Sequence, residues 1–438
     1  MQGAGAAAAA KSLEFAASSE PAMRKWPIEE GPDTPKLCLA PGDGGRPLPA
    51  NLQPAAGPGP GSGGNFGGFL DPKAEPSPNG SLEIAHQRIR QLGVTHLLGV
   101  NVSNVGGNWS EESVRRAVDT AKAAGLVAYN AMINVPASVI YGRESRAKDL
   151  EPFIASIQAA GKGGLTVVEY NFYAHRATEG YYETIGRANS GYTGFDSELE
   201  LLIDGNGRVV GPIFRDAHGK ITPQTLADFP NAKRVKFKDL PPLAGEGAHT
   251  LDEMWANITY FLKAVIPVAE KAGIRMALHP NDPPAPVSRG SQQIMATLAG
   301  WKHLIAIVDS PANGITFDCG VTRELGEDAI ATAEYFASRR RINHVHYRNV
   351  LVDKPYEKYQ EVFIDAGMND MFGVMKALVR NKYTGTIYPE HPRALDADRD
   401  RVERGGRIAG YPGGGGYDGI TFSVAYARAM MQAALESV

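Results

Sequence analysis

The 438-residue sequence has neither an excess of charge of one sign nor a run of about 20 apolar residues. Its formal net charge is −3 and no basic stripe or tail stands out, so we expect no nucleic acid and no anionic membrane surface as a partner. The missing apolar run predicts that no transmembrane helix is present. The two cysteines, Cys38 and Cys319, are too few for a disulfide framework, and we interpret both as free thiols.

The N-terminal part of the chain carries little information about the fold. Residues 1–34 are predicted to be a disordered leader, within which residues 3–10 (GAGAAAAA) look like the end of an export signal without its charged start. A plain Ala-rich leader is the alternative, so the location stays open between the bacterial cytoplasm and the periplasm. Residues 42–68 are very rich in Gly and Pro, which indicates a functional lid or a mobile segment.

From residue 35 onward, short apolar runs alternate with helical patterns. These runs, the strand candidates, are residues 36–39, 95–100, 126–133, 165–172, 274–278, 315–317, 342–347 and 385–388. Each is followed by a predicted helix, and continuous apolar strands are typical of buried parallel strands. The pattern predicts an α/β fold: a single (β/α)8 TIM barrel over residues 35–438 with a flexible N-terminal extension. A doubly wound open sheet is the alternative, but no glycine-rich dinucleotide motif follows the first strand.

The alternation is interrupted after the fourth strand. Residues 173–250 contain turn signals, such as DGNG at 204–207, and scattered β-type residues. We predict that they form an insertion after strand 4, with a small hairpin at residues 201–213. Beyond it, helices are predicted at residues 251–272, 291–302, 327–339, 369–381 and 420–435.

The fifth to eighth strand candidates each end at a residue type that binds metals. In chain order these residues are His279, Asp318, His346 and Glu390. Because the carboxyl ends of barrel strands meet at one mouth, the four side chains should converge there. Two imidazoles and two carboxylates suit Mn, Fe(II), Co or Zn, and the carboxylates also admit Mg. The sequence therefore predicts one divalent metal site.

Three neighbouring residues leave alternatives open. His344 lies two residues before His346, and we interpret it as a core residue or a supporting group. Cys319 should face the opposite side from Asp318, although a strand register shifted by one residue would exchange the two. Asp282 lies in the Pro-rich turn after the fifth strand, where it either orients the preceding histidine or caps the loop.

The same motifs resemble those of mannonate dehydratases of the bacterial hexuronate pathway. The resemblance is strongest over residues 261–284, FLKAVIPVAEKAGIRMALHPNDPP. Shorter matching motifs are YNF at 170–172, NGITF at 313–317, HYR at 346–348, DMFGVM at 370–375, PEH at 389–391 and GY at 416–417. The resemblance covers the C-terminal half well, whereas the first 150 residues match only in their alternation of strand and helix patterns. The resemblance implies a xylose-isomerase-like barrel, one divalent metal, usually Mn or Fe, and dehydration of D-mannonate to 2-keto-3-deoxygluconate.

Carried over by position, His279 and His346 match the family's metal-binding histidines. Asp318 stands where the family usually has a cysteine ligand, and Glu390 stands where it usually has an aspartate. Both replacements still bind metals, but they make the ligand set harder and closer to that of barrel sugar isomerases and epimerases.

The resemblance also implies roles around the metal. His391 and Tyr417 match residues associated with proton transfer, and Arg348 matches one that holds substrate. A guanidinium suits a substrate carboxylate because it offers paired hydrogen bonds, and an ion pair on the barrel rim is its alternative role. Asn171 and Asp282 complete the candidate substrate-binding residues.

These observations predict a metal-dependent dehydratase, a hydro-lyase, that acts on a small sugar acid and forms a homo-oligomer. A metal-dependent sugar isomerase or epimerase on the same barrel is the first alternative, and a keto-sugar lyase or hydratase is the second. A non-catalytic sugar-binding barrel is disfavoured because such a module has no need of four metal ligands.

Overall fold

The computed structural model describes residues 30–44, 82–102, 108–211, 214–215, 221–222, 230–403 and 412–438. The predictions for the leader up to residue 29, and for the Gly/Pro-rich segment from residue 45 onward, lie outside the described residues. None of the helices in the described ranges combines the length and the apolar character needed to cross a bilayer.

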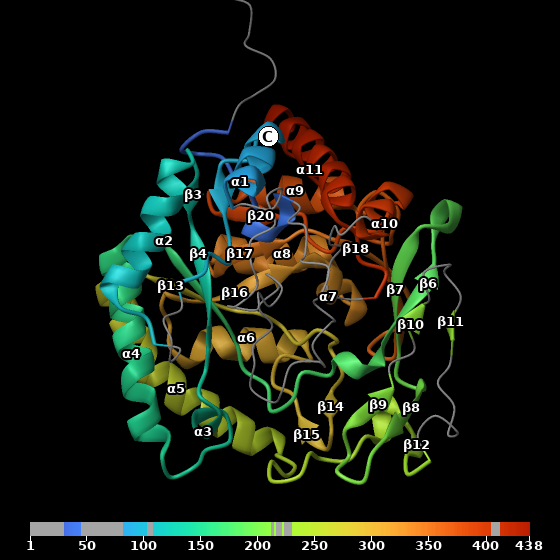
Figure 1. Cartoon of the computed structure of the whole chain (residues 1–438). Coiled ribbons are helices and arrows are strands. Elements are labelled where there is room, and N and C mark those ends of the chain that lie inside the picture. Colours follow the sequence, from blue (N-terminus) through green and yellow to red (C-terminus); the bar gives the residue numbers. More distant parts are fainter. Residues whose placement is uncertain are drawn as a thin grey trace, which may run out of the picture.

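A closed ring of parallel strands forms the centre of the fold (Figure 1). The strands are β1 (Lys36–Leu39), β2 (His96–Leu97), β3 (Val127–Ala128), β4 (Asn130–Asn134), β5 (Val167–Asn171), β13 (Arg275–Leu278), β16 (Asn313–Asp318), β17 (Ile342–His346) and β20 (Thr386–Tyr388). Their order is β3-β2-β1-β20-β17-β16-β13-β5-β4.

The ring closes at Tyr129, the residue that separates β3 from β4. β3 pairs with β2 and β4 pairs with β5, so the two ends of the sheet are consecutive parts of one stretch of chain. The N–H of Tyr129 donates to the carbonyl of Leu97 (2.9 Å), and its own carbonyl accepts from the N–H of Val167 (3.2 Å). Counting β3 and β4 as one position, eight strand positions form a (β/α)8 barrel, as predicted, and the open sheet is excluded.

The eight predicted strand candidates all coincide with strands of the barrel. Every residue of β16 and of β17 is buried, because one side of each strand faces the barrel interior and the other faces the helices. This two-sided burial explains why no alternation of buried and exposed residues appears along these strands.

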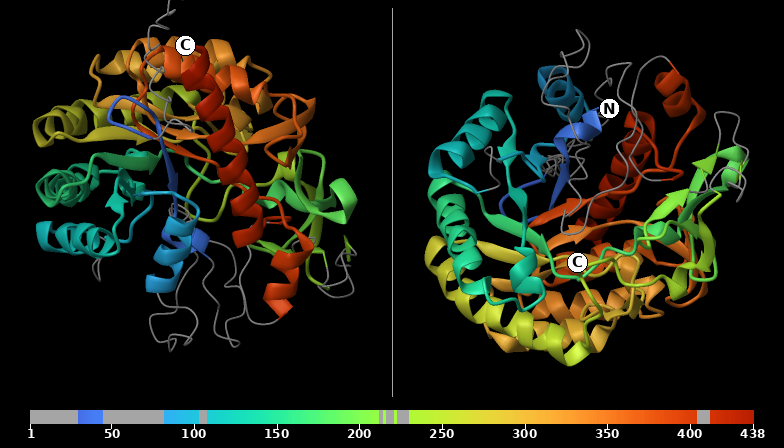
Figure 2. Two further views of the ribbon diagram at one scale, coloured as in Figure 1. Left: turned by 90° about the horizontal axis from the view of Figure 1, so that it is seen from above. Right: turned by 60° about the horizontal axis from the view of Figure 1, so that its bottom comes forward.

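Helices surround the strands on the outside (Figure 2). They are α1 (Leu82–Gln91), α2 (Glu111–Ala123), α3 (Ala137–Ile140), α4 (Arg146–Gly163), α5 (Leu251–Ala272), α6 (Leu298–Ile307), α7 (Cys319–Glu324), α8 (Ala329–Ser338), α9 (Met371–Arg380), α10 (Asp396–Glu403) and α11 (Tyr417–Ser437). Capping boxes begin two of them, with Ser110 at the start of α2 and the Thr250–Glu253 pair at the start of α5. Short 3-10 turns lie at Pro41–Gly44, Thr178–Gly180, Arg187–Asn189 and Phe237–Asp239.

One predicted helix begins in the wrong place. Residues 291–302 were expected to be helical, but Ser291–Gln292 is strand β15, which pairs with β14 (Val287–Ser288). Helix α6 begins only after its N-cap, Thr297. The buried side chains of Ile294 and Met295 belong to the connecting loop, and they imitate helical spacing in the sequence.

The insertion after strand 4 contains strands that lie outside the barrel. They are β6 (Tyr181–Ile185), β7 (Gly191–Asp196), β8 (Glu200–Ile203), β9 (Val209–Gly211), β10 (Phe214–Arg215), β11 (Ile221–Thr222) and β12 (Lys233–Lys236). In Figure 1 they lie together on the right, opposite helices α2 and α4. The predicted hairpin corresponds to β8 and β9, which are antiparallel, and β12 extends it on the other edge of β8.

A second excursion from the barrel joins this insertion and was not predicted. After β17 the chain forms β18 (Asn349–Lys354) and β19 (Lys358–Val362). They complete a four-stranded sheet in the order β18-β19-β7-β6, which we call the outer sheet. Its hydrophobic cluster is separate from that of the barrel and includes Phe195, Phe237 and Tyr359.

Candidate active site

Four predicted metal ligands lie together at the carboxyl ends of neighbouring strands. We call them the mouth group: His279 after β13, Asp318 at the end of β16, His346 at the end of β17 and Glu390 after β20. One ligand atom from each lies within 4.8 Å of the others, and all four side chains are buried. The barrel therefore brings these side chains together as the strand-end pattern predicted.

A contact on the far side of its ring orients His279, whereas His346 contacts other members of the mouth group. The Nδ1 of His279 lies 2.7 Å from the carbonyl of Pro280, so this nitrogen donates and Nε2 faces the mouth group. The Nδ1 of His346 lies 3.0 Å from that Nε2 and 3.0 Å from Oε1 of Glu390. Burial lowers the pKa of His279 to about 4 and that of His346 to about 3. Both rings are therefore neutral near pH 7 and can offer a lone pair to a metal.

Asp318 and Cys319 face opposite ways, as expected. Oδ1 of Asp318 caps α7 by accepting from the N–H of Val321 (2.8 Å), while Oδ2 faces the mouth. Burial raises the pKa of Asp318, and the nearby guanidinium of Arg348 opposes that rise. The Sγ of Cys319 instead donates to the carbonyls of His346 (3.4 Å) and Arg348 (3.2 Å). Asp318, and not its neighbouring thiol, is thus the side chain available to a metal.

Arg348 is 2% exposed and lies in a cage of acidic side chains. Its nitrogens approach five carboxylates: Glu324 (2.7 Å), Asp318 (3.1 Å), Asp282 (3.2 Å), Glu390 (3.2 Å) and Glu361 (3.8 Å). This arrangement favours the ion-pair role over the expected contact with substrate, since the guanidinium is already engaged by the chain's own acids. It also concentrates negative charge in a buried place, which a bound cation would neutralise.

The other substrate-binding candidates have different surroundings. Asp282 precedes a cis proline. It accepts from the hydroxyl of Tyr181 (2.5 Å) and pairs with Arg348, rather than orienting His279 or capping the loop. Asn171 ends β5, is partly buried and has its Nδ2 3.7 Å from the Sδ of Met132.

The two proton-transfer candidates are placed differently. His391 adjoins the mouth group, with its Nε2 3.6 Å from Oε2 of Glu390 and its Nδ1 2.9 Å from Oε2 of Glu361. Burial would lower the pKa of His391, but the carboxylates of Glu361 and Glu390 outweigh burial and raise it. Tyr417 is the first residue of α11, and its hydroxyl donates to the carbonyl of Arg88 on α1 (3.1 Å). The geometry thus places His391, and not Tyr417, beside the mouth group.

Comparison with known proteins identifies the family. The sequence model of the D-mannonate dehydratase (UxuA) family matches residues 79–434. The chain belongs to this family. It is therefore an enzyme of the hydro-lyase class, and the resemblance seen in the sequence is confirmed.

Individual relatives agree with this family. A mannonate dehydratase of Streptococcus equi subsp. zooepidemicus is 30% identical over 338 residues, which are 75% of this chain and 86% of that protein. A mannonate dehydratase of Enterococcus faecalis is 29% identical over 327 residues, covering 71% and 86%. The crystal structure of mannonate dehydratase from Streptococcus suis serotype 2 superimposes with a TM-score of 0.63 at 25% identity, covering 80% of this chain and 90% of that chain.

Glu169 is a buried residue of the barrel interior that the sequence patterns did not single out. Its Oε1 accepts from the hydroxyl of Thr316 (2.8 Å) and lies 3.6 Å from Nε2 of His346. Burial raises the pKa of Glu169 to about 8. An acidic residue inside the apolar run VVEYN was the available signal, because charged residues are almost never fully buried without a partner. His344 bonds through Nδ1 to Thr386 (2.8 Å), which fits its predicted core or supporting role.

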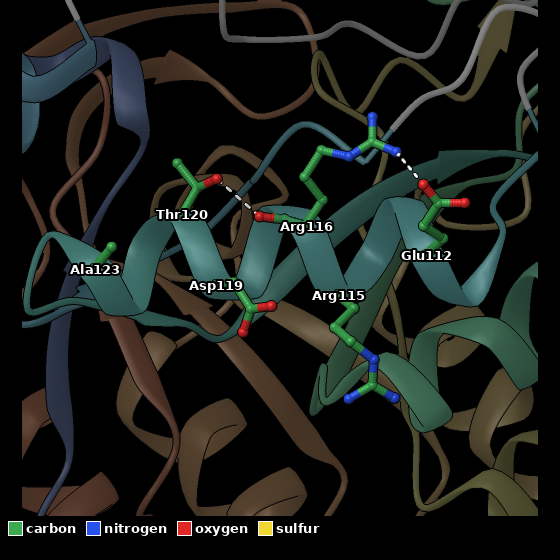
Figure 3. A pocket seen from close by; sticks show the side chains of 6 residues that line it. All are labelled: Glu112, Arg115, Arg116, Asp119, Thr120 and Ala123. Carbon is green, nitrogen blue, oxygen red and sulfur yellow. Dashed lines mark hydrogen bonds and ion pairs between the residues drawn. The ribbon is translucent and has the colours of Figure 1, made fainter.

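A shallow hollow on the outside of α2 is a separate feature (Figure 3). It is lined by Glu112, Arg115, Arg116, Asp119, Thr120 and Ala123. Arg116 pairs with Glu112 one helical turn away (3.0 Å), and both side chains are exposed. Exposed pairs of this kind contribute little and are common on helix surfaces. The hollow contains no member of the mouth group, so we place the chemistry at the barrel mouth.

Proposed function

We propose that the chain dehydrates D-mannonate to 2-keto-3-deoxy-D-gluconate, using one divalent metal ion bound by the mouth group. The observation that carries this proposal is the convergence of two neutral imidazoles and two carboxylates at the mouth of a barrel of the mannonate dehydratase family.

The donor atoms fit a single ion. Metal–nitrogen and metal–oxygen bonds of about 2.0–2.2 Å leave opposite ligand atoms roughly 4.4 Å apart at most. The Nδ1 of His346 lies 3.0 Å from Nε2 of His279, 3.0 Å from Oε1 of Glu390 and 3.9 Å from Oδ2 of Asp318, and that Oδ2 lies 4.0 Å from Nε2 of His279. These separations are within that limit. The mixed nitrogen and oxygen set suits Mn or Fe(II), and Mg, Co or Zn are the other candidates.

The reaction needs an acid and a base as well as a metal. When bound, the ion would act as a Lewis acid toward the substrate's oxygens and so make the C2 proton removable. His391, beside Glu390, accepts the C2 proton. The C2 electron pair forms a C2–C3 double bond, and the C3 hydroxyl leaves as water after gaining a proton. The resulting enol takes a proton at C3 and releases the proton of its C2 hydroxyl, which gives the 2-keto product.

The remaining candidates keep narrower roles in this proposal. Tyr417 is the candidate donor of the proton that the leaving hydroxyl needs. To donate it, the Tyr417 hydroxyl would have to give up its present hydrogen bond to the carbonyl of Arg88. Asn171 is retained as a substrate-binding residue at the end of β5. Arg348 holds the acidic side chains of the mouth in place, because it pairs with Asp318 and Glu390, and Asp282 in turn pairs with Arg348.

A substrate panel tests the proposal. Purified protein loaded with Mn or Fe(II) is given D-mannonate, its C2 epimer D-gluconate, and neutral aldoses and ketoses. We expect D-mannonate to yield a 2-keto-3-deoxy acid and the neutral sugars to stay unchanged. Turnover of a neutral sugar with no change in the sugar acids would replace the dehydratase with an isomerase or epimerase, and turnover of a keto-sugar alone would point to a keto-sugar lyase or hydratase.

A further inference from the structure

We propose that Glu361 and Arg393 are positioning residues that hold the His391 ring in the orientation required for proton transfer. Because Glu361 belongs to the outer sheet, that sheet would help to orient the residue that accepts the proton. It rests on the proposed function, in which His391 accepts the C2 proton.

The backbone of His391 is held in a rarely used conformation. Its φ is 47°, in the left-handed region, where a residue with a side chain is strained. Such conformations persist where surrounding contacts determine them. Arg393 supplies these contacts, since its Nε (2.9 Å) and its Nη2 (2.6 Å) both donate to the carbonyl of His391.

The ring is held by a carboxylate that the same arginine holds. Oε2 of Glu361 lies 2.9 Å from Nδ1 of His391 and 2.9 Å from Nη2 of Arg393. With Nδ1 engaged by Glu361, the other ring nitrogen, Nε2, is directed toward Glu390 of the mouth group (3.6 Å). A carboxylate on one imidazole nitrogen fixes which nitrogen is available to react.

Both positioning residues depend on the outer sheet. Glu361 lies on β19 opposite Thr193 of β7, and the hydroxyl of Thr193 accepts from Nη1 of Arg393 (2.6 Å). Arg393 is 1% exposed, and Glu361 is 2% exposed. The two insertions in the barrel, one after β5 and one after β17, therefore pair with each other next to His391, which follows β20.

We assign orientation of His391, rather than metal binding, to Glu361. Asp282, Glu361 and His391 lie close enough to one another to bind an ion. However, the Oε2 of Glu361 accepts from Nδ1 of His391 and from Nη2 of Arg393 (2.9 Å each). Glu361 is thus already engaged with the ring and with the arginine.

Replacing Glu361 tests the proposal, with a matched control in the same part of the chain. Glu361→Ala should lower kcat by roughly 10²-fold, the lower range for a general base, with KM and metal content near wild type. Glu361→Gln, which keeps an acceptor oxygen and the side-chain shape, should recover part of the loss. Glu179 also lies between a histidine (His175, 2.8 Å) and an arginine (Arg289, 2.8 Å), so Glu179→Ala should leave kcat unchanged.

A double variant separates positioning from general damage to the fold. If Glu361 acts through His391, adding Glu361→Ala to His391→Ala should lower kcat no further. A further loss that multiplies with the first, or an equal loss in Glu179→Ala, would overturn the proposal. Should Glu361→Ala fail to fold, Arg393→Lys replaces it, because a lysine cannot make the paired donation to the carbonyl of His391.

A crystal structure of the Glu361 variants gives a readout that does not depend on the reaction. We expect the His391 ring to turn away from Glu390 in Glu361→Ala and to stay in place in Glu361→Gln. An unchanged ring in Glu361→Ala would contradict the proposal even if activity falls. If wild-type protein dehydrates no sugar acid, the proposed function fails, and the orientation of this ring alone still decides whether Glu361 positions it.

Discussion

At the scale of the residue, the two histidines of the mouth group have their chemistry set by burial and by one partner each. His279 donates to a backbone carbonyl, and His346 turns Nε2 toward Glu169. Because burial keeps both rings neutral, each has a lone pair directed into the mouth. Metal-binding histidines are commonly oriented by such an outer partner.

Removing either histidine should remove the metal. In His279→Ala and His346→Ala one of four donors is lost, so elemental analysis should find little bound Mn or Fe in either variant. Cys319→Ser is the control, since the thiol faces backbone carbonyls, and it should keep the wild-type metal content. Full metal content in both alanine variants, or its loss in Cys319→Ser, would show that other residues bind the ion.

Glu169 should strengthen metal binding without touching the metal. It faces the ring nitrogen of His346 that points away from the mouth (3.6 Å). Loss of such a partner typically weakens metal affinity about 10–100-fold, and we expect this for Glu169→Gln. Calorimetric titration at a pH above the pKa of Glu169 measures the effect, with Tyr170→Phe on the same strand as the control. Equal metal affinity in Glu169→Gln and wild type would show that Glu169 does not support metal binding.

At the scale of the element, Asp318 joins the metal site to the start of a helix. One carboxylate oxygen caps α7 and the other faces the mouth. Asp318→Asn keeps an oxygen that can cap the helix, whereas Asp318→Ala removes the cap, which is worth about 1 kcal/mol. Both variants should lose metal affinity, but the metal-free alanine variant should unfold at lower urea concentration. Equal unfolding midpoints would mean that the cap contributes nothing.

The barrel strands and the mouth group could be predicted from the sequence because their signals are local. A buried parallel strand is short and its pattern includes several apolar residues, and the candidate ligand is the polar residue at its carboxyl end, as at Asp318 and His346. The strands β18 and β19 carry no comparable signal, because they are antiparallel and β18 is half exposed. Glu361 could not be assigned from sequence, since its role depends on a contact with His391 that only the folded outer sheet creates.

At the scale of the whole molecule, the barrel and the outer sheet contribute to one end of the ring. Barrel strands supply the mouth group, and the outer sheet supplies Tyr181 against Asp282 and Glu361 against His391. Arg348 links the two parts, since it contacts acidic side chains from both. A homo-oligomeric state stays a prediction, which light scattering of the purified protein would test.

The central claim is that this site removes water from a sugar acid. The most direct measurement is the mass of the product formed from D-mannonate by the Mn- or Fe(II)-loaded protein. Dehydration predicts a product lighter than the substrate by one water, formed by wild type and lost in His279→Ala, where a ligand is missing. A product of unchanged mass would mean isomerisation or epimerisation, and would contradict the account.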